Sequence, residues 1–357
     1  MLGSQVTHRW IASQMFTGIL KVMKNLPIQL VILSLGLCVG AGASFTTASA
    51  ARLSLPQPSI RNNMPSPQRI SPRRREPPAQ ILFDDFNYSK HREMIKHGWI
   101  LRRTAGWPGV PGATWGSEGV SFLRDPDERG NRMVRMIAST AGTATSTRQT
   151  QICHQRKYLE GTYAARVRFT DEPISGPGGD QLVESFYTIS PLKAPMDPDY
   201  SELDFEYLPN GGWGVKGPTL YQTTWETFFP EPNWKMDNVS NNTSGSRAGW
   251  HILVTQVAND KVKYFVDGKL QAEHGERFYP ESLMSINFNL WFIKDGLAQG
   301  QAVRQYYEDI DWVFHQAGTA LTPEEIEPKV ASMRRKSIKF KDTVRAPVSA
   351  LTSPCDF

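Results

Sequence analysis

The chain has 357 residues, of which 39% are hydrophobic and 21% charged, values that are ordinary for a soluble globular protein. Its formal net charge of +5 is unevenly distributed. Residues 1–79 hold nine Lys or Arg against one Glu, which makes +8 and leaves −3 for residues 80–357. Because the basic excess lies outside the part that can form a core, the charge argues against nucleic-acid binding by the folded part.

The first 50 residues have the features of a secretory signal peptide. Lys21 and Lys24 precede an apolar run over residues 30–40, and small residues follow it up to Ala50. An uncleaved membrane anchor is the alternative, since the run approaches the length needed to span a bilayer. The small residues favour cleavage after Ala50, so we expect a secreted protein without a membrane attachment. Residues 51–79, rich in Pro and Arg, predict a disordered linker.

Short strand-like runs separated by Gly, Pro, Asn and Asp recur from Ile81 onward. Asp267-Gly268 predicts a hairpin turn between two of them. Many strands with hardly a helix between them predict an all-β fold, an antiparallel sandwich. The predicted strands are Gly119–Leu123, Arg132–Ala138, Thr147–Ile152, Gly161–Thr170, Leu182–Ile189, Glu202–Tyr207, Thr219–Thr224, Trp250–Ala258, Lys261–Val266, Met284–Trp291 and Tyr307–His315.

The sequence ends in a tail over residues 319–357, after a predicted folded domain over residues 80–318. Thr322 followed by Pro323 and two Glu residues predicts the start of a short helix, which we expect Pro328 to interrupt. Of the three cysteines, one lies in the signal peptide. Cys153 and Cys355 could pair in an oxidising compartment, but no feature of the sequence brings them together, and we expect them to be unpaired. No Cys or His spacing predicts a metal site, and we expect no cofactor.

The segment Ser201–Tyr207 alternates acidic and apolar residues, which is the period of a β-strand. Glu202, Asp204 and Glu206 should therefore share one face of this strand. Three carboxylates in a row are costly unless they face a wet cleft. Because like charges repel, at least one of them should hold its proton more tightly than a free carboxyl group. The strand is suited to acid–base chemistry, although a calcium-binding or merely solvated acidic strand is the alternative.

This acidic strand and its surroundings resemble family 16 glycoside hydrolases, the group that includes laminarinases, lichenases and xyloglucan transglycosylases. The E-x-D-x-E pattern at Glu202–Glu206 is short, and its specificity comes from the order of other segments between Ile81 and about Gln316. The segments with the family's spacing are Asp84–Phe86, Gly161–Arg166, Tyr221–Trp225, Trp250–His251, Tyr264–Gly268, Ile286–Trp291 and Glu308–Val313.

The resemblance implies a β-jelly-roll sandwich, similar to concanavalin A, whose concave face binds a β-glucan-like polysaccharide. It also implies retaining hydrolysis with Glu202 as nucleophile, Glu206 as acid/base and Asp204 as their support. With Glu202 and Asp204 ionised, repulsion should raise the pKa of Glu206, which would then arrive protonated. Two Glu residues at the ends of the motif can lean toward each other, as the close pair of a retaining enzyme requires.

Aromatic faces stack on sugar rings and amides bind hydroxyl groups, so we expect sugar contacts from tryptophans and one glutamine. For Trp115 and Trp291, packing in the core is the alternative. We expect a monomeric, endo-acting, retaining β-glucan hydrolase, with a transglycosylase or a non-catalytic glycan-binding lectin as alternatives. The candidate sugar-binding residues are Trp115, Trp213, Gln222, Trp225 and Trp291.

Overall fold

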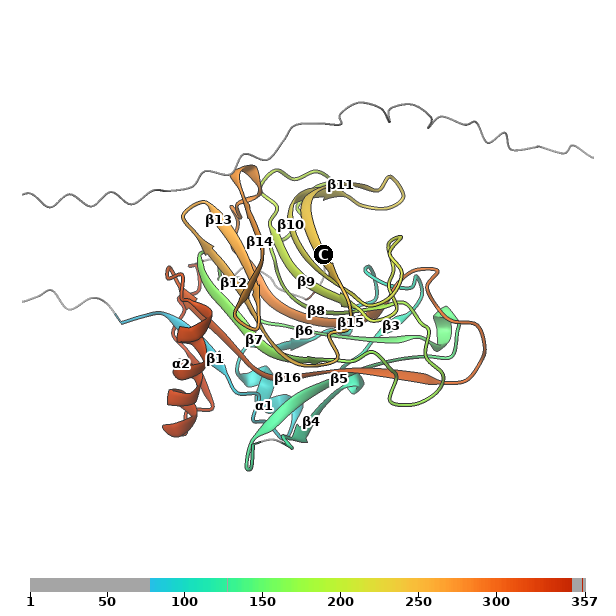
Figure 1. Ribbon diagram of the computed structural model, residues 1–357, viewed down its shortest axis with the longest axis horizontal. Helices are drawn as coiled ribbons and strands as arrows, with labels where there is room; N and C mark the ends of the chain where they lie inside the picture. Colours follow the sequence, from blue (N-terminus) through green and yellow to red (C-terminus); the bar gives the residue numbers. More distant parts are fainter. Residues whose placement is uncertain (1–77, 127, 349–354, 356–357) are drawn as a thin grey trace, which may run out of the picture. The chain divides into compact units, whose positions relative to one another are not determined.

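A computed structural model describes residues 78–126, 128–348 and 355, and the predicted signal peptide and nearly all of the linker lie outside them (Figure 1). Its helices are α1 (His91–Lys96) and α2 (Pro323–Arg335). Its strands are β1 (Ile81–Asp84), β2 (Ile100–Leu101), β3 (Thr114–Trp115), β4 (Val120–Arg124), β5 (Arg132–Thr140), β6 (Arg148–Cys153), β7 (Gly161–Phe169), β8 (Leu182–Ile189), β9 (Glu202–Leu208), β10 (Thr219–Phe229), β11 (Lys235–Ser244), β12 (Gly249–Ala258), β13 (Lys261–Val266), β14 (Lys269–Gly275), β15 (Ser285–Phe292), β16 (Arg304–Ala317) and β17 (Phe340–Asp342).

The strands form an all-β sandwich, as the sequence predicts. The inner sheet has the order β11–β10–β9–β8–β15–β6–β2, with every pair antiparallel. The outer sheet has the order β14–β13–β12–β7–β16. The long strand β16 then pairs with β5 along its first half and with β1 along its second half. In Figure 1 the inner strands curve around a concave face, and β9 lies inside this sheet between β10 and β8.

The hydrophobic core lies between the two sheets because alternate residues of each strand point inward. On β9 the inward residues are Leu203 and Phe205, which are 2% and 0% exposed. The Phe205 ring packs edge-on against Tyr264 of the outer sheet, with ring centroids 5.3 Å apart. The acidic residues of β9 are therefore held on the opposite, concave face by the burial of their apolar neighbours.

Each strand predicted from the sequence corresponds to a strand of the structure. Asp267 and Gly268, both with positive φ, form the turn between β13 and β14. The strands that the sequence did not predict include β11, whose run Lys235–Ser244 is mostly polar and half-exposed or exposed. Such a strand lacks the apolar alternation by which strands are predicted.

Helix α2 packs on the outer sheet and continues through Pro328 to Arg335, so the expected interruption was wrong. A proline inside a helix costs about 3 kcal/mol. Against this cost, Ile326 and Val330 are buried in one cluster with Phe83 and other residues of the outer sheet. Tertiary packing therefore outweighs the local preference. No helix among the described residues is long and apolar enough to cross a membrane.

Cys153 and Cys355 form a disulfide, with their Cα atoms 5.6 Å apart, and the expectation that they are unpaired was wrong. The two cysteines are 202 residues apart in the sequence. They meet because the chain returns after α2, where β17 pairs with β1. Cys355 then lies beside β6 and β2, with its sulfur near the carbonyl oxygen of Ile100.

Candidate active site

Strand β9 lies between β10 and β8, so its three acidic residues lie on the concave face and away from the edges of the inner sheet. Residues directly opposite each other on neighbouring strands point to the same face of a sheet. The strand register thus identifies the side chains beside the carboxylates. Along β8 and β10 they are Ser185, Tyr187, Ile189, Tyr221, Thr223 and Trp225.

Glu202 lies at the start of β9 and is 8% exposed. The hydroxyl group of Tyr200, itself buried, donates a hydrogen bond of 2.6 Å to Glu202 Oε2. Burial raises the pKa of Glu202 from 4.5 to about 7, and the hydrogen bond from Tyr200 acts in the opposite direction. This bond fixes one carboxylate oxygen of Glu202.

Asp204, at the centre of the motif, is 3% exposed and accepts a hydrogen bond of 2.8 Å from Trp225 Nε1. Its pKa is raised well above the ordinary range, first by burial and then by the charges of Glu202 and Glu206. Burial and two acidic neighbours therefore both disfavour the ionised form of Asp204.

Glu206 is the one carboxyl residue of the three that is partly exposed. Burial and the charge of Glu202 raise its pKa to about 8. The sequence predicted a raised pKa for Glu206 but ionised forms of Glu202 and Asp204. In the structure the pKa of all three is raised, because loss of water acts on the whole row. Such a cluster releases its protons one at a time, which provides both a protonated acid and an ionised base.

A polar network lies beside the carboxylates on β8, β15 and β6. Tyr187 Oη accepts hydrogen bonds from Gln151 Nε2 at 2.8 Å and Asn289 Nδ2 at 3.2 Å. Gln151 Oε1 accepts one of 2.9 Å from Arg102, and Ser185 Oγ donates to Asn289 Oδ1. The sequence did not predict these residues, although pairing of β8 with β9 places Tyr187 and Ser185 opposite Asp204 and Glu206.

Three of the predicted tryptophans lie near the carboxylates. Trp225 is half-buried and bonds Asp204, and Trp291 lines the same small pocket as the carboxylates. Trp213 is 47% exposed, with its ring 6.2 Å from Trp291 and 5.4 Å from Tyr221. Trp213, Trp291 and Tyr221 give the concave face apolar surface on the side of Glu206, whereas Trp225 lies opposite Glu202.

Trp115 has a packing role in this structure. It is 4% exposed, its indole nitrogen donates to the carbonyl oxygen of Gly106 at 3.0 Å, and the Arg102 guanidinium lies 4.1 Å from its ring. Its contacts therefore support the loop between β2 and β3.

Gln222 is not in a position to contact a ligand on the concave face. It lies opposite Phe205 in the register and is 0% exposed, so its side chain points into the core. On either side of it along β10, Tyr221 and Thr223 point to the concave face instead. The prediction placed Gln222 on the wrong face of the strand, since successive side chains alternate between the two faces.

The pocket at the carboxylates contains two residues that sequence reasoning missed, Trp107 and Pro108. They belong to the loop between β2 and β3, between Gly106 and Gly109, both with positive φ. A Gly-Trp-Pro-Gly run predicts a turn, but it does not indicate where in the fold that turn lies. Among the described residues, no three His, Cys, Asp or Glu side chains group in the manner of a metal site.

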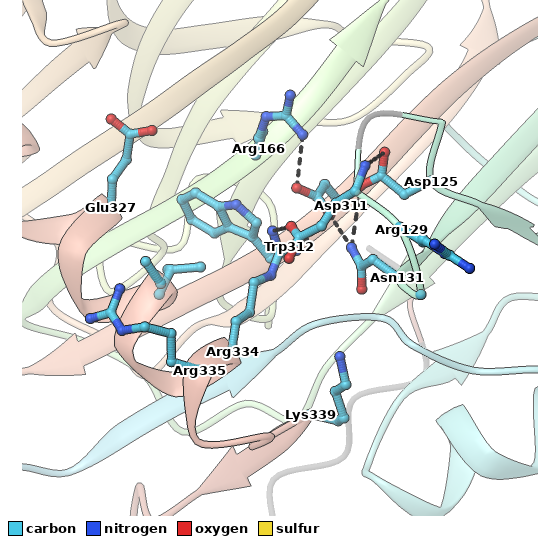
Figure 2. A pocket seen from close by; sticks show the side chains of 14 residues that line it. Asp125, Arg129, Asn131, Arg166, Asp311, Trp312, Glu327, Arg334, Arg335 and Lys339 are labelled. Carbon is cyan, nitrogen blue, oxygen red and sulfur yellow. Dashed lines mark hydrogen bonds and ion pairs between the residues drawn. The ribbon is translucent and has the colours of Figure 1, made fainter.

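A second pocket, of about 730 Å³, lies beside α2 (Figure 2). Arg334 of α2 donates hydrogen bonds to Asp85, Glu128 and Asp311 at 2.6–2.7 Å. Asp311 also pairs with Arg166 at 2.9 Å. Lys339 pairs with Asp85 at 3.1 Å, so three cations balance three carboxylates. The cluster fastens α2 to the sandwich, and we assign this pocket no catalytic role.

No family model matches the chain, and no curated protein matches it. The chain is similar to solved structures of glycoside hydrolases at low sequence identity. The β-glucanase of Bacillus licheniformis is 16% identical, with a TM-score of 0.48, and the match covers 66% of this chain and 97% of that one. A laminarinase from Flavobacterium sp. UMI-01 is 16% identical, with a TM-score of 0.46 and coverages of 66% and 98%. Porphyranase B from Zobellia galactanivorans is 16% identical, with a TM-score of 0.47 and coverages of 66% and 90%.

Proposed function

We propose that the protein is a secreted, retaining glycoside hydrolase of the family 16 type that cleaves a β-glucan-type polysaccharide. The observation that carries the proposal is the row Glu202, Asp204 and Glu206 on the concave face, with two of its members fixed by Tyr200 and Trp225. The ordered motifs of the sequence support the same family. The endo-acting mode expected from the sequence is a separate question, which product lengths would answer.

In this mechanism Glu202 attacks the anomeric carbon while Glu206 donates its proton to the leaving oxygen. Glu206, now ionised, then takes a proton from the water that hydrolyses the glycosyl-enzyme. A raised pKa suits Glu206 for the first step. Asp204, whose pKa burial and both neighbouring charges raise, stays protonated between them, so that Glu202 can ionise without facing a second charge at the adjacent position.

The disulfide supports secretion, because disulfides persist mainly in oxidising compartments. The predicted signal peptide leads to the same proposal. Detection of the mature protein outside the cell, with the disulfide formed, would test this part separately from catalysis.

The deciding experiment uses the disulfide-bonded protein from residue 51 to residue 357. It is incubated with mixed-linkage glucan, laminarin, xyloglucan, agar, carrageenan and galactan, and reducing ends are counted. We expect one of these polymers to be cleaved, and Glu202→Gln and Glu206→Gln to lose nearly all activity. The exposed Glu172→Gln serves as a matched control. Full activity of the Glu202→Gln protein would overturn the proposal. The anomeric configuration of the first product shows whether hydrolysis retains the configuration of the substrate.

A further inference from the structure

The concave face is unequally exposed on the two sides of β9. On the side of β8, β15 and β6, Ser185, Tyr187, Asn289 and Gln151 are only 2–4% exposed. On the side of β10 and β11, the facing residues are half-exposed or exposed, apart from the buried Thr223. The catalytic carboxylates therefore lie at the boundary between a covered half and an open half. The residues of the open half are Tyr221, Trp225, Asn238, Ser240 and Asn242.

The cover on the first half includes Trp107 and Pro108 of the loop between β2 and β3, which line one pocket with Ser185, Tyr187 and Asn289. The Trp107 ring lies 5.8 Å from that of Phe228 and 6.0 Å from that of Trp234, at the end of β10 and before β11. Phe228 and Trp234 are themselves 5.5 Å apart. We call Trp107, Phe228 and Trp234 the aromatic bridge. Trp107 lines the pocket that also contains all three catalytic carboxylates.

The loop that carries the bridge is held firmly at its base. Arg102, 2% exposed, donates 2.9 Å hydrogen bonds to the carbonyl oxygens of Trp107 and Thr104. The indole of Trp115 donates to the neighbouring carbonyl of Gly106. A buried guanidinium bonded to loop carbonyls fixes their position strongly. The bridge is therefore part of the resting fold.

The far edge of the covered half is closed as well. Cys153 of β6 lies in the same row across the inner sheet as Asp204, through Asn287 and Tyr187. The disulfide places Cys355, 3% exposed, at this edge. A polysaccharide that continued past the carboxylates in this direction would meet first Trp107 and Pro108 and then this covered edge.

We propose that Trp107, which Phe228 and Trp234 contact from the open half, makes the cleft blind on the side of β8 and β15 and is a specificity-determining residue. The polysaccharide lies over β10 and β11, and only a short stretch of sugar fits beyond the carboxylates. Cleavage then takes place close to a chain end and releases short oligosaccharides, in place of the endo action expected from the sequence. This inference rests on the proposed hydrolase function and specifies the form of its substrate.

The test compares the native protein with Trp107→Ala and Trp234→Ala on the polysaccharide that it cleaves. Viscosity loss and new reducing ends are measured together, and products are sized. The native protein should release short products from the start with little loss of viscosity. Both variants should show a several-fold larger viscosity loss per reducing end and longer early products, because the blind end has been opened. Trp107→Phe, which keeps a ring at the bridge, should retain the native pattern.

Ile95→Ala, an exposed apolar residue on α1, is the control for surface truncation and should leave the ratio unchanged. A rapid viscosity loss by the native protein, with the same ratio in Trp107→Ala, would overturn the bridge as a determinant. A small chromogenic β-glucoside oligomer separates this failure from that of the proposed function, since it needs no long cleft. Its turnover by the native protein would uphold the hydrolase proposal whatever the polymer ratios show.

Discussion

Replacing Glu202 by Gln should stabilise the folded protein, and the gain should grow as the pH rises. Burial holds the pKa of Glu202 at about 7, above the 4.5 of an exposed glutamate. A carboxyl group with a raised pKa favours the folded state below its unfolded pKa, and this advantage is lost as the pH rises through the folded pKa. Glutamine carries no charge and avoids that loss.

The size of the effect follows from the shift. The pKa of Glu202 rises from 4.5 to about 7. Because each pKa unit corresponds to about 1.4 kcal/mol, the ionised side chain destabilises the folded state by about 3 kcal/mol. Only a small part of this cost is present at pH 5, where Glu202 is protonated in the folded protein. Glutamine can still accept the hydrogen bond from Tyr200 through its Oε1 atom. The difference in unfolding free energy between Glu202→Gln and native protein should therefore increase by about 2 kcal/mol between pH 5 and pH 8.

Urea unfolding of both proteins at pH 5, 6, 7 and 8, with the disulfide intact, measures this difference directly. The exposed Glu172→Gln is the control, and its difference from the native protein should stay constant. A constant difference for Glu202→Gln as well would refute the reasoning, because it would mean that the folded protein solvates the Glu202 charge as well as water does.

Three further predictions concern the catalytic carboxylates and the ion pairs of α2. Activity should rise as the pH increases through about 7, where Glu202 ionises, and fall above about 8, where Glu206 loses its proton, and a profile lacking the upper limb would argue against Glu206 as the acid. Tyr200→Phe removes the hydrogen bond that stabilises ionised Glu202, so the rising limb should move to higher pH by up to about one unit, and an unmoved limb would remove Tyr200 from this role. Arg334→Ala takes one cation from each of two fully buried carboxylates, Asp85 and Asp311, which keep Lys339 and Arg166 as partners, and should lower the unfolding free energy in urea by about 2 kcal/mol, whereas the exposed neighbour Arg335→Ala should change it little.

The sequence predicted those features whose physical signal is local. The alternation along Ser201–Tyr207 places the acids on one face, and Asp267-Gly268 provides the turn that its positive φ angles require. The alternation along β10 also determines which face Gln222 occupies. The prediction failed there because Gln222 lies opposite the core residue Phe205, and only its neighbours Tyr221 and Thr223 lie opposite the acids.

Other features depend on contacts that no local pattern records. The strand β11 is stabilised by pairing with β10 and lacks an apolar stripe of its own. Trp107 reaches Phe228 because the loops of distant strands meet above the inner sheet. The disulfide, with its 202-residue separation, is of the same kind. Such contacts require the complete topology, which in a sandwich is set by non-local pairing.

The fastening of the tail to the sandwich bears on how the protein can be produced in pieces. A chain ended at Gly318 would lose β17, which covers the edge of β1, and would uncover the apolar surface beneath Ile326. An exposed strand edge beside an apolar patch promotes association between copies. Recombinant versions that stop after the last long strand should therefore precipitate or form multimers, even though every catalytic side chain is present.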